Sequence, residues 1–244
     1  MNIIVIPDIH TKYEKAERII QKYNSSHRFV FVGDYFDQFD DNPEINEETA
    51  EWLKSHLNDP NKVFLVGNHD IHYIPWANFF CSGFSNKKKE YINSVLSIDD
   101  WNKLKYIHFE NGWYFSHAGI TEHWFKHPVT NNITADYVNK VINDSIENLK
   151  MSKLENAIWA SDFFRGGKNK KGGILWNDWR NMDLILGIKQ VVGHTPINRI
   201  TSIADNITNS HIVNVDCSLS GIYMSEVLEI SNGGQTKIID TSYV

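Results

Sequence analysis

The chain is poor in features that define several classes of protein. It has two cysteines, Cys81 and Cys217, in unrelated contexts, so neither a disulfide framework nor a thiolate metal site is expected. No apolar run comes close to the roughly 20 residues that a membrane-spanning helix needs. The first residues lack the basic region of a secretory signal. We therefore expect a soluble cytoplasmic protein with no membrane contact.

Positive charge is also scarce. The sequence has 24 lysines and arginines against 30 aspartates and glutamates, a formal net charge of -6. Because proteins that bind long nucleic acids usually carry a basic surface, no extended nucleic-acid surface is expected. A phosphate-bearing substrate remains compatible with this composition, since bound metal ions would add local positive charge.

The apolar content, by contrast, is sufficient for a large core. The chain has 244 residues, 41% of them hydrophobic, with 8 tryptophans, 10 tyrosines and 13 phenylalanines. At this length one domain is the usual arrangement. Neither an internal repeat nor a linker is visible, so residues 1–244 are expected to form a single domain.

Short apolar runs and helical patterns alternate in the first half. Strands are predicted at 2–7, 28–32 and 62–66, with helices at about 12–23 and 46–57 between them. Such alternation is typical of α/β folds with parallel strands.

The second half is richer in strands. Asn111-Gly112, between two apolar runs, predicts a hairpin with a type I′ turn. The sequence pattern of residues 134–157 predicts a mostly helical segment. Further strands are expected near 188–192, 211–216, 222–230 and 235–240. Together the two halves predict an α/β fold in which two sheets pack together and helices flank them.

Polar motifs with metal-ligand residues follow five of the apolar runs. Buried parallel strands place functional residues just beyond their carboxyl ends, so these side chains are expected to converge. A mixture of nitrogen and oxygen ligands suits divalent manganese, iron, zinc or cobalt rather than copper(I). The candidate ligands are Asp8, His10, Asp34, Asn68, His117 and His194.

A pair of metal ions gives these residues a definite chemistry. Two ions about 3.5–4 Å apart can hold a bridging water, lower its pKa and clamp a phosphoryl group for in-line attack. The leaving oxygen then needs a proton, and His69, beside a candidate ligand, is well placed to donate it. Asp37 is the candidate for the carboxylate that orients His69 and keeps it protonated. The sequence thus predicts a two-metal hydrolase.

The order of these motifs resembles the calcineurin-like metallophosphoesterase superfamily. The elements D-x-H, G-D-x-x-D, G-N-H-[DE], a later histidine and G-H lie between positions 8 and 194. They are most similar to the phosphoprotein phosphatase branch and the related bacterial and bacteriophage enzymes. The resemblance implies a four-layer αββα sandwich and direct attack by a metal-bridging hydroxide.

The resemblance also implies a role for each candidate residue. It implies two divalent metal ions, manganese first, with iron, zinc, cobalt or nickel as alternatives. Asp37 and His69 would form the acid dyad. The first metal would be bound by Asp8, His10 and Asp34, and the second by Asp34, Asn68, His117 and His194.

Phosphate recognition departs from the family pattern. Gln38 and Val66 stand where the phosphatase branch usually has arginines, and neither can replace that charge. Arg180 lies in a segment, Ile174 to Arg180, that also resembles the branch. The candidates for substrate binding are Arg180 and Asn68, with Arg165 and Arg199 as weaker alternatives.

The predicted function is hydrolysis of phosphomonoesters, similar to that of Ser/Thr protein phosphatases. The substrate could be a phosphoprotein, a nucleotide or a small phosphoester. Alternatives on the same site are a dinucleoside polyphosphate or nucleotide hydrolase, and a phosphodiesterase or nuclease. A metal- or phosphate-binding module without catalysis is less favoured, since such a protein has no need of Asp37 and His69.

Three further residues receive structural interpretations. Asp70 is read as a helix cap, and His72 is left without an assigned role. The run Lys87 to Lys89 is expected to lie on a solvated helix face.

Overall fold

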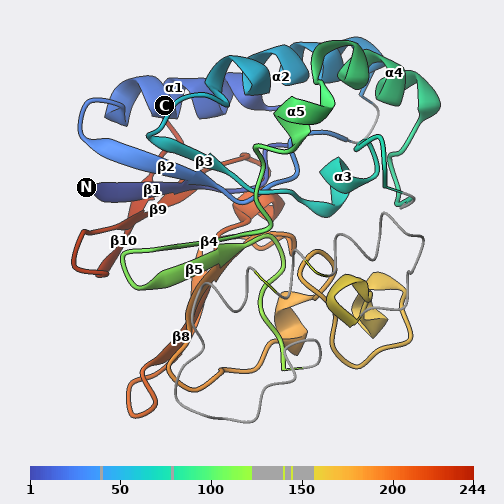
Figure 1. Ribbon diagram of the computed structural model, residues 1–244. Coiled ribbons are helices and arrows are strands. Elements are labelled where there is room, and N and C mark those ends of the chain that lie inside the picture. Colours follow the sequence, from blue (N-terminus) through green and yellow to red (C-terminus); the bar gives the residue numbers. More distant parts are fainter. Residues whose placement is uncertain (39–40, 78–79, 123–139, 141–143, 145–156) are drawn as a thin grey trace.

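The computed structural model describes residues 1–38, 41–77, 80–122, 140, 144 and 157–244. It contains two mixed β-sheets of five strands each, flanked by helices (Figure 1). The predicted α/β fold with two packed sheets is therefore confirmed. The helix expected over 134–157 falls almost entirely outside the described residues.

The first sheet has the strand order β10-β9-β1-β2-β3. Strands β1 (Asn2–Ile6), β2 (His27–Phe31) and β3 (Lys62–Phe64) are parallel, so their carboxyl ends share one edge. Strand β9 (Glu226–Ile230) runs antiparallel to β1, and β10 (Thr236–Asp240) runs antiparallel to β9.

The second sheet has the order β4-β5-β6-β8-β7. Strands β5 (Trp113–Ser116), β6 (Lys189–Val192) and β8 (Ser210–Asn214) are parallel. Strands β4 (Ile107–Glu110) and β7 (Thr201–Asp205) are antiparallel additions at its two edges. Each sheet thus has three adjacent parallel strands, at one side of the first sheet and at the centre of the second, and these can present several strand ends together.

The β4–β5 connection confirms the predicted hairpin. Asn111 and Gly112 have φ values of 51° and 81°, as a type I′ turn requires at both central positions. Strand β7 was not expected from the sequence. Most of its residues are exposed, so it lacks the alternation of apolar and polar side chains that would have indicated a strand.

Helices α1 (Tyr13–Tyr23), α2 (Pro43–His56) and α4 (Asn86–Val95) cover the outer face of the first sheet (Figure 1). Helix α2 begins three residues earlier than predicted. The Asn42 side chain accepts a hydrogen bond from the Ile45 amide, and Pro43 is accommodated in the first turn, where its missing N–H costs nothing.

The remaining helices in the part of the chain that the structure describes are short. Helix α5 (Ile98–Trp101) begins with a capping box, since the Ser97 hydroxyl accepts from the Asp100 amide. Helix α3 (Asn68–Ile71) begins directly on one of the polar motifs. The 3-10 helices are η1 (Ala157–Trp159), η2 (Phe163–Arg165), η3 (Trp179–Asn181) and η4 (Cys217–Ser220).

Alternating side chains of β1 account for the packing of these layers. Ile3 and Val5 belong to an apolar cluster with Phe115 and Val191 of the second sheet. Ile4 and Ile6 point the other way, into the larger cluster that includes residues of α1 and α2. Because both faces of the strand are buried, its sequence reads as a continuous apolar run.

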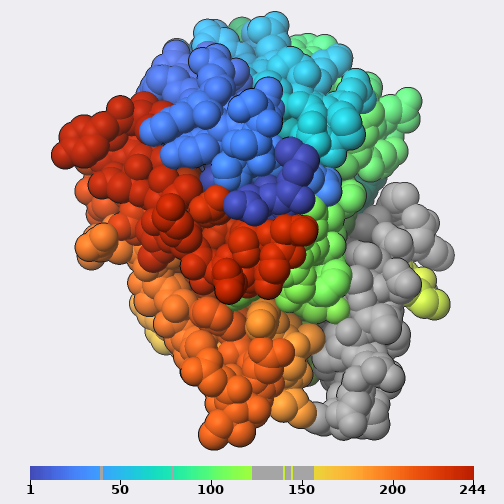
Figure 2. Space-filling model, turned by 90° about the vertical axis from the view of Figure 1, so that its left-hand side faces the viewer, coloured from blue at the N-terminus to red at the C-terminus, as the bar shows by residue number. Residues whose placement is uncertain are grey.

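The two ends of the chain lie close together. Figure 2 shows the carboxyl-terminal strands, in red, beside the amino-terminal residues, in blue. The Lys15 ammonium donates a hydrogen bond to the backbone oxygen of Val244 at 2.9 Å. No helix in the described part of the chain is long and apolar enough to cross a membrane.

Candidate active site

The polar motifs meet at the carboxyl ends of five parallel strands, three in the first sheet and two in the second. The loop after each of these strands supplies one or two of the predicted site residues. Asp8 and His10 follow β1, Asp34 and Asp37 follow β2, Asn68 and His69 follow β3, His117 follows β5, and His194 follows β6. The structure therefore brings together all six predicted metal ligands and both predicted members of the acid dyad.

Asp34 lies between two groups of possible metal ligands. One group is Asp8, His10 and Asp34, and the other is Asp34, His117 and His194. Within each group the ligand atoms lie within 4.8 Å of one another. The Asp34 Oδ2 atom is 3.8 Å from His10 Nε2 and 3.4 Å from His117 Nε2.

Around His117 several lone pairs face one another. Its Nδ1 atom is 2.9 Å from the Val32 backbone oxygen, so Nδ1 carries the proton and Nε2 presents a lone pair. That Nε2 atom lies 2.9 Å from the Asn68 side-chain oxygen and 3.4 Å from an Asp34 oxygen. The opposite tautomer would only move the conflict to the Val32 oxygen. A cation bound among these atoms would remove the repulsion between the lone pairs, because each of them could then coordinate the cation.

The first group has the same character. His10 Nδ1 is 2.6 Å from the Asp37 backbone oxygen, so its proton is used there and Nε2 faces Asp34. Asp8 is 2% exposed, and its Oδ1 atom has no hydrogen-bond partner. An unpartnered carboxylate oxygen is costly to bury unless a cation binds it. The donors of both groups therefore fit divalent metal ions.

Burial favours the neutral form of two of the candidate ligands, His117 and His194. It lowers the pKa of His117, and it lowers the pKa of His194 well below the ordinary value, with His117 adding to the second effect. Neutral imidazole is the form that binds a metal ion.

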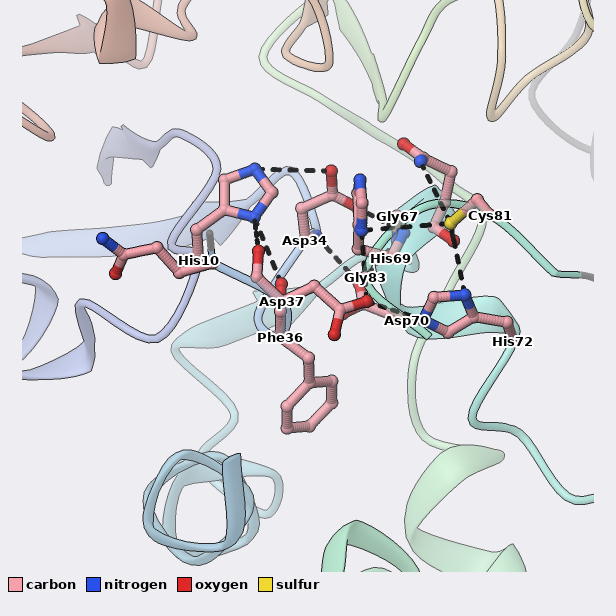
Figure 3. Close-up of polar contacts among 12 residues, drawn as sticks. His10, Asp34, Phe36, Asp37, Gly67, His69, Asp70, His72, Cys81 and Gly83 are labelled. Atoms are coloured by element: carbon pink, nitrogen blue, oxygen red, sulfur yellow. Dashed lines mark hydrogen bonds and ion pairs between the residues drawn. The ribbon is translucent and has the colours of Figure 1, made fainter. Parts of the chain in front are cut away.

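The predicted dyad is formed, and Asp37 has more partners than expected. His69 Nδ1 is 3.2 Å from Asp37 Oδ2, and His72 Nε2 is 2.8 Å from the same oxygen (Figure 3). The other oxygen accepts hydrogen bonds from the Tyr73 hydroxyl at 2.6 Å and from the Lys88 ammonium at 2.9 Å. Three hydrogen bonds, together with the close contact to His72, thus fix the orientation of one carboxylate.

These contacts change the protonation of the dyad. Burial alone would raise the pKa of Asp37, but hydrogen bonds from His69, His72 and Tyr73 hold it far below the ordinary value. Burial alone would lower the pKa of His69, but the carboxylates of Asp34 and Asp37 raise it well above 6.5. The pair is therefore an aspartate and an imidazolium, the form of His69 that can donate a proton.

Lys88 corrects one expectation from the sequence. It is only 7% exposed rather than part of a solvated helix face, and it also pairs with Asp41 at 2.5 Å. Lys87 beside it does have the expected exposure, at 60% of its side chain. Three consecutive lysines gave no signal that the middle one points inward.

The Asp70 carboxylate caps helix α3 and also binds backbone amides of the loop after β2. One of its oxygens accepts from the amides of Gly67 and Asp34, at 2.7 and 2.8 Å, and the other accepts from the Tyr35 amide at 2.8 Å. The first bond caps α3, as expected. The other two connect α3 to the loop after β2, which sets the position of the Asp34 backbone.

The backbone of the site is unusual. Four of the site residues have left-handed conformations, and non-glycine residues adopt these rarely. At two other positions a glycine is required by close approach: a Cβ atom at Gly67 would lie 2.1 Å from Asp34 Oδ1, and one at Gly193 would lie 2.1 Å from Asp8 Oδ1. The left-handed residues are His10 (44°), Asp34 (52°), Asp37 (61°) and His194 (67°).

A cavity of about 640 Å³ opens beside these residues, a size typical of small-molecule sites. Arg165 is the one lysine or arginine among the described residues that line it. Its Nη2 atom donates to the His194 backbone oxygen at 3.0 Å and to Thr195 Oγ1 at 2.8 Å. Its Nε atom lies 3.2 Å from Asp178. The guanidinium is thus held at the cavity by neutral and anionic partners.

The geometry argues against Arg180 as the phosphate-binding residue. Its side chain is 60% exposed, forms two hydrogen bonds with Asp178 and stacks on Phe164, and it does not line the cavity. Arg199 is also outside the cavity lining and pairs with Glu226 at 2.8 Å. Of the two positions that depart from the family pattern, Gln38 lines the cavity and Val66 is fully buried.

This fold and site agree with a comparison to known proteins. The family model for calcineurin-like phosphoesterases matches residues 1–206, so the chain belongs to that family. The family membership supports a hydrolase and confirms the resemblance seen in the motifs. No curated protein sequence matches the chain.

Two solved structures share the fold at low sequence identity. A cold-active protein tyrosine phosphatase is 16% identical, with a TM-score of 0.56, and the match covers 99% of this chain and 79% of that one. A protein serine/threonine phosphatase from Saccharomyces cerevisiae is 12% identical, with a TM-score of 0.53, and the match covers 98% and 80% of the two chains. At these identities the likeness shows the fold alone.

Proposed function

We propose that the protein is a metal-dependent phosphatase that hydrolyses phosphomonoesters. The observation that carries the proposal is the set of buried lone pairs around Asp34 and His117, which a bound cation would reconcile. A proton donor and a guanidinium at the same cavity supply the other requirements of phosphoester hydrolysis. A binding module would have no use for the Asp37–His69 pair.

Two divalent cations, manganese being our first choice, would occupy the two ligand groups. Asp34 would bridge them. Bound there, they would supply Lewis-acid charge to the phosphoryl group and activate water for attack. Asp8 and His10 would complete one group, and Asn68, His117 and His194 the other.

The remaining residues of the site act on the substrate. Arg165 replaces Arg180 in our assignment and would hold the phosphoryl oxygens, since a guanidinium suits that geometry. His69 would give its Nε2 proton to the leaving oxygen, while its Nδ1 proton stays with Asp37. Because Asp37 is anchored on both oxygens, His69 would be held in a single orientation throughout the reaction.

Nucleotides form a second candidate class of substrate. Phe80 and Tyr223 line the same cavity, and Phe80 is 70% exposed. Flat aromatic side chains beside a phosphate site can stack on a nucleobase. This observation places nucleotide esters beside phosphoproteins as substrates to be tested.

We further propose that residues 1–244 form one domain. Strands β9 and β10 follow the matched residues 1–206 but belong to the first sheet, where β9 pairs with β1. The central strand of that sheet is therefore flanked by the last part of the chain.

Hydrolysis assays on metal-stripped protein test the proposal. The substrates are p-nitrophenyl phosphate, bis-p-nitrophenyl phosphate, a phosphopeptide and diadenosine tetraphosphate, each with and without added Mn²⁺. We expect Mn²⁺-dependent turnover, faster on a monoester than on the diester. Absence of turnover on every substrate, with metal still bound in stoichiometric amount, would contradict the enzyme and favour a binding module.

A further inference from the structure

A third group of possible ligands lies beside the two around Asp34. It consists of His69, His72 and Cys81, whose ligand atoms all lie within 4.8 Å of one another. The Cys81 sulfur is 3.2 Å from His72 Nδ1 and 3.9 Å from His69 Nδ1, and Figure 3 shows it between the two rings. These separations are close to those between neighbouring ligands of a tetrahedral ion with bonds of about 2.0–2.3 Å.

His72 is oriented as a ligand would be. It is fully buried, and its Nε2 atom lies 2.8 Å from Asp37, a carboxylate with strongly lowered pKa. The Nε2 atom is turned toward this carboxylate, which leaves Nδ1, on the Cys81 side of the ring, as the atom that would bind an ion. A carboxylate behind a histidine in this way is the usual support of a metal-bound imidazole.

The donors distinguish this group from the other two. The groups around Asp34 offer carboxylate oxygens and imidazoles, whereas this one offers a thiol and two imidazoles. A thiolate with imidazoles selects zinc or cadmium over manganese or magnesium. His69 and Cys81 both line the cavity, so an ion can reach them and a fourth position is open to water.

We propose that His69, His72 and Cys81 form a separate binding site for a thiophilic divalent cation such as Zn²⁺, and that its occupation inhibits turnover. Binding releases two protons to solvent, that of the Cys81 thiol and that on Nδ1 of the His69 imidazolium, since the thiolate and the neutral imidazole are the ligand forms. The ion also takes the Nδ1 position of His69 that faces Asp37. His69 then keeps only its Nε2 proton and cannot donate it without becoming an anion.

The inhibition rests on the proposed function, but the site does not. Binding is therefore tested without an activity assay, by titrating Mn²⁺-loaded protein with Cd²⁺ and following the ultraviolet thiolate-to-cadmium absorption. The groups around Asp34 contain no thiol, so the absorption reports on cysteine alone. We expect one equivalent to saturate it in the wild-type protein.

Cysteine variants show which of the two cysteines produces the thiolate-to-cadmium absorption. Cys81→Ser and Cys81→Ala should lose the absorption, and two different replacements guard against a folding defect specific to one. Cys217→Ser is the matched control and should keep it, because Cys217 is buried elsewhere, against the Glu226 backbone oxygen. A wild-type protein without the absorption, or Cys81 variants that retain it, would overturn the site.

Zinc inhibition tests the consequence for catalysis. At a fixed, saturating concentration of Mn²⁺, the Cys81 variants should need roughly 10–100 times more Zn²⁺ than the wild type for half inhibition, the usual cost of a weakened metal site. Cys217→Ser should match the wild type. Unchanged zinc sensitivity of variants that have lost the cadmium signal would overturn the inhibitory role while leaving the site.

Discussion

At the scale of single residues, Asp34 is the point on which both predicted metal groups depend. Asparagine keeps its size but loses the charge and one ligand oxygen. Asp34→Asn should therefore lose bound metal and turnover together. Metal analysis of desalted protein and a phosphatase assay measure the two quantities. The matched control is Asp99→Asn, at an exposed position of α5; turnover preserved in Asp34→Asn would refute the bridging role.

His69 is the residue whose contribution depends on the leaving group. His69→Asn should lower kcat by about 10²–10⁴-fold on substrates with poor leaving groups, the usual share of general acid catalysis. With very good leaving groups the loss should shrink, while the manganese content stays unchanged. A series of aryl phosphates of rising leaving-group pKa gives this comparison. An equal loss along the whole series would exclude proton donation.

Arg165 and Arg180 both pair with Asp178, but we expect their replacement to affect kcat/KM differently. Arg165→Met should lower kcat/KM roughly 10–100-fold, because a hydrogen bond to a charged group contributes about 1.5–3 kcal/mol. Arg180→Met removes the same charge from an exposed position outside the cavity and should change little. Steady-state kinetics of both variants on one substrate decide the assignment. The reverse ranking would restore Arg180.

Which residues the sequence could indicate depends on where they lie. Ligands such as Asp8 and His117 follow apolar strands directly, so a local pattern was enough to find them. The side chains that support the dyad or face the cavity from other segments have no such pattern. Cys81 is in no motif, and Lys88 stands within a run of lysines. The sequence favours Arg180 over Arg165 as the phosphate ligand. Only the tertiary contacts show that Arg165 lines the cavity, whereas Arg180 lies outside it.

At the scale of elements, helix α4 reaches the dyad through Lys88. The ammonium joins Asp37 to Asp41 and to the Gly83 backbone oxygen, so it anchors one end of the helix to the loop after β2. Lys88→Met should let the Asp37 carboxylate turn and lower kcat roughly 10–100-fold, the scale of a misplaced catalytic group. KM should change less, since Lys88 does not line the cavity.

Two further variants separate positioning from simple loss of stability. Lys88→Arg should recover part of kcat, and the loss in Lys88→Met should be greater for poor leaving groups, as for His69. Lys87→Met is the matched control, because that lysine is exposed on the same helix. A drop in kcat that is independent of the leaving group would point to a structural role only.

Elements were predicted well where their pattern was local and less well elsewhere. The strands β1, β2 and β3 were recognised because both faces are buried, and the Asn111-Gly112 hairpin because its turn has a specific chemistry. Strand β7 was missed because pairing with β8 rather than its own apolar content holds it in place. The start of α2 was placed late because the apolar period begins after the Asn42 cap.

At the scale of the whole molecule, the predicted metal site joins the two sheets. Asp8, His10, Asp34 and Asn68 extend from the first sheet, whereas His117 and His194 extend from the second. Ions bound between them would act as cross-links that exist only in the folded state. Two sheets packed by apolar side chains alone would have no such dependence.

Metal removal should therefore lower thermal stability as well as activity. At a free Mn²⁺ concentration 100 times the dissociation constant, one site contributes about 2.7 kcal/mol. For a chain of this size that corresponds to a rise in Tm of about 5–10 °C. Calorimetry with chelator and with Mn²⁺ measures the difference, and Asp34→Asn should show almost none. An equal Tm in both conditions would contradict the cross-link.

The left-handed backbone at four of the site positions restricts how this protein can evolve. Asparagine, aspartate, histidine and glycine enter that conformation most readily, and other residues pay about 1–3 kcal/mol. At positions 10, 34, 37 and 194 the backbone therefore accommodates aspartate, asparagine, histidine or glycine, but it penalises glutamate and cysteine. A lineage that acquired a preference for softer metals would have to do so through residues on ordinary backbone, such as Cys81.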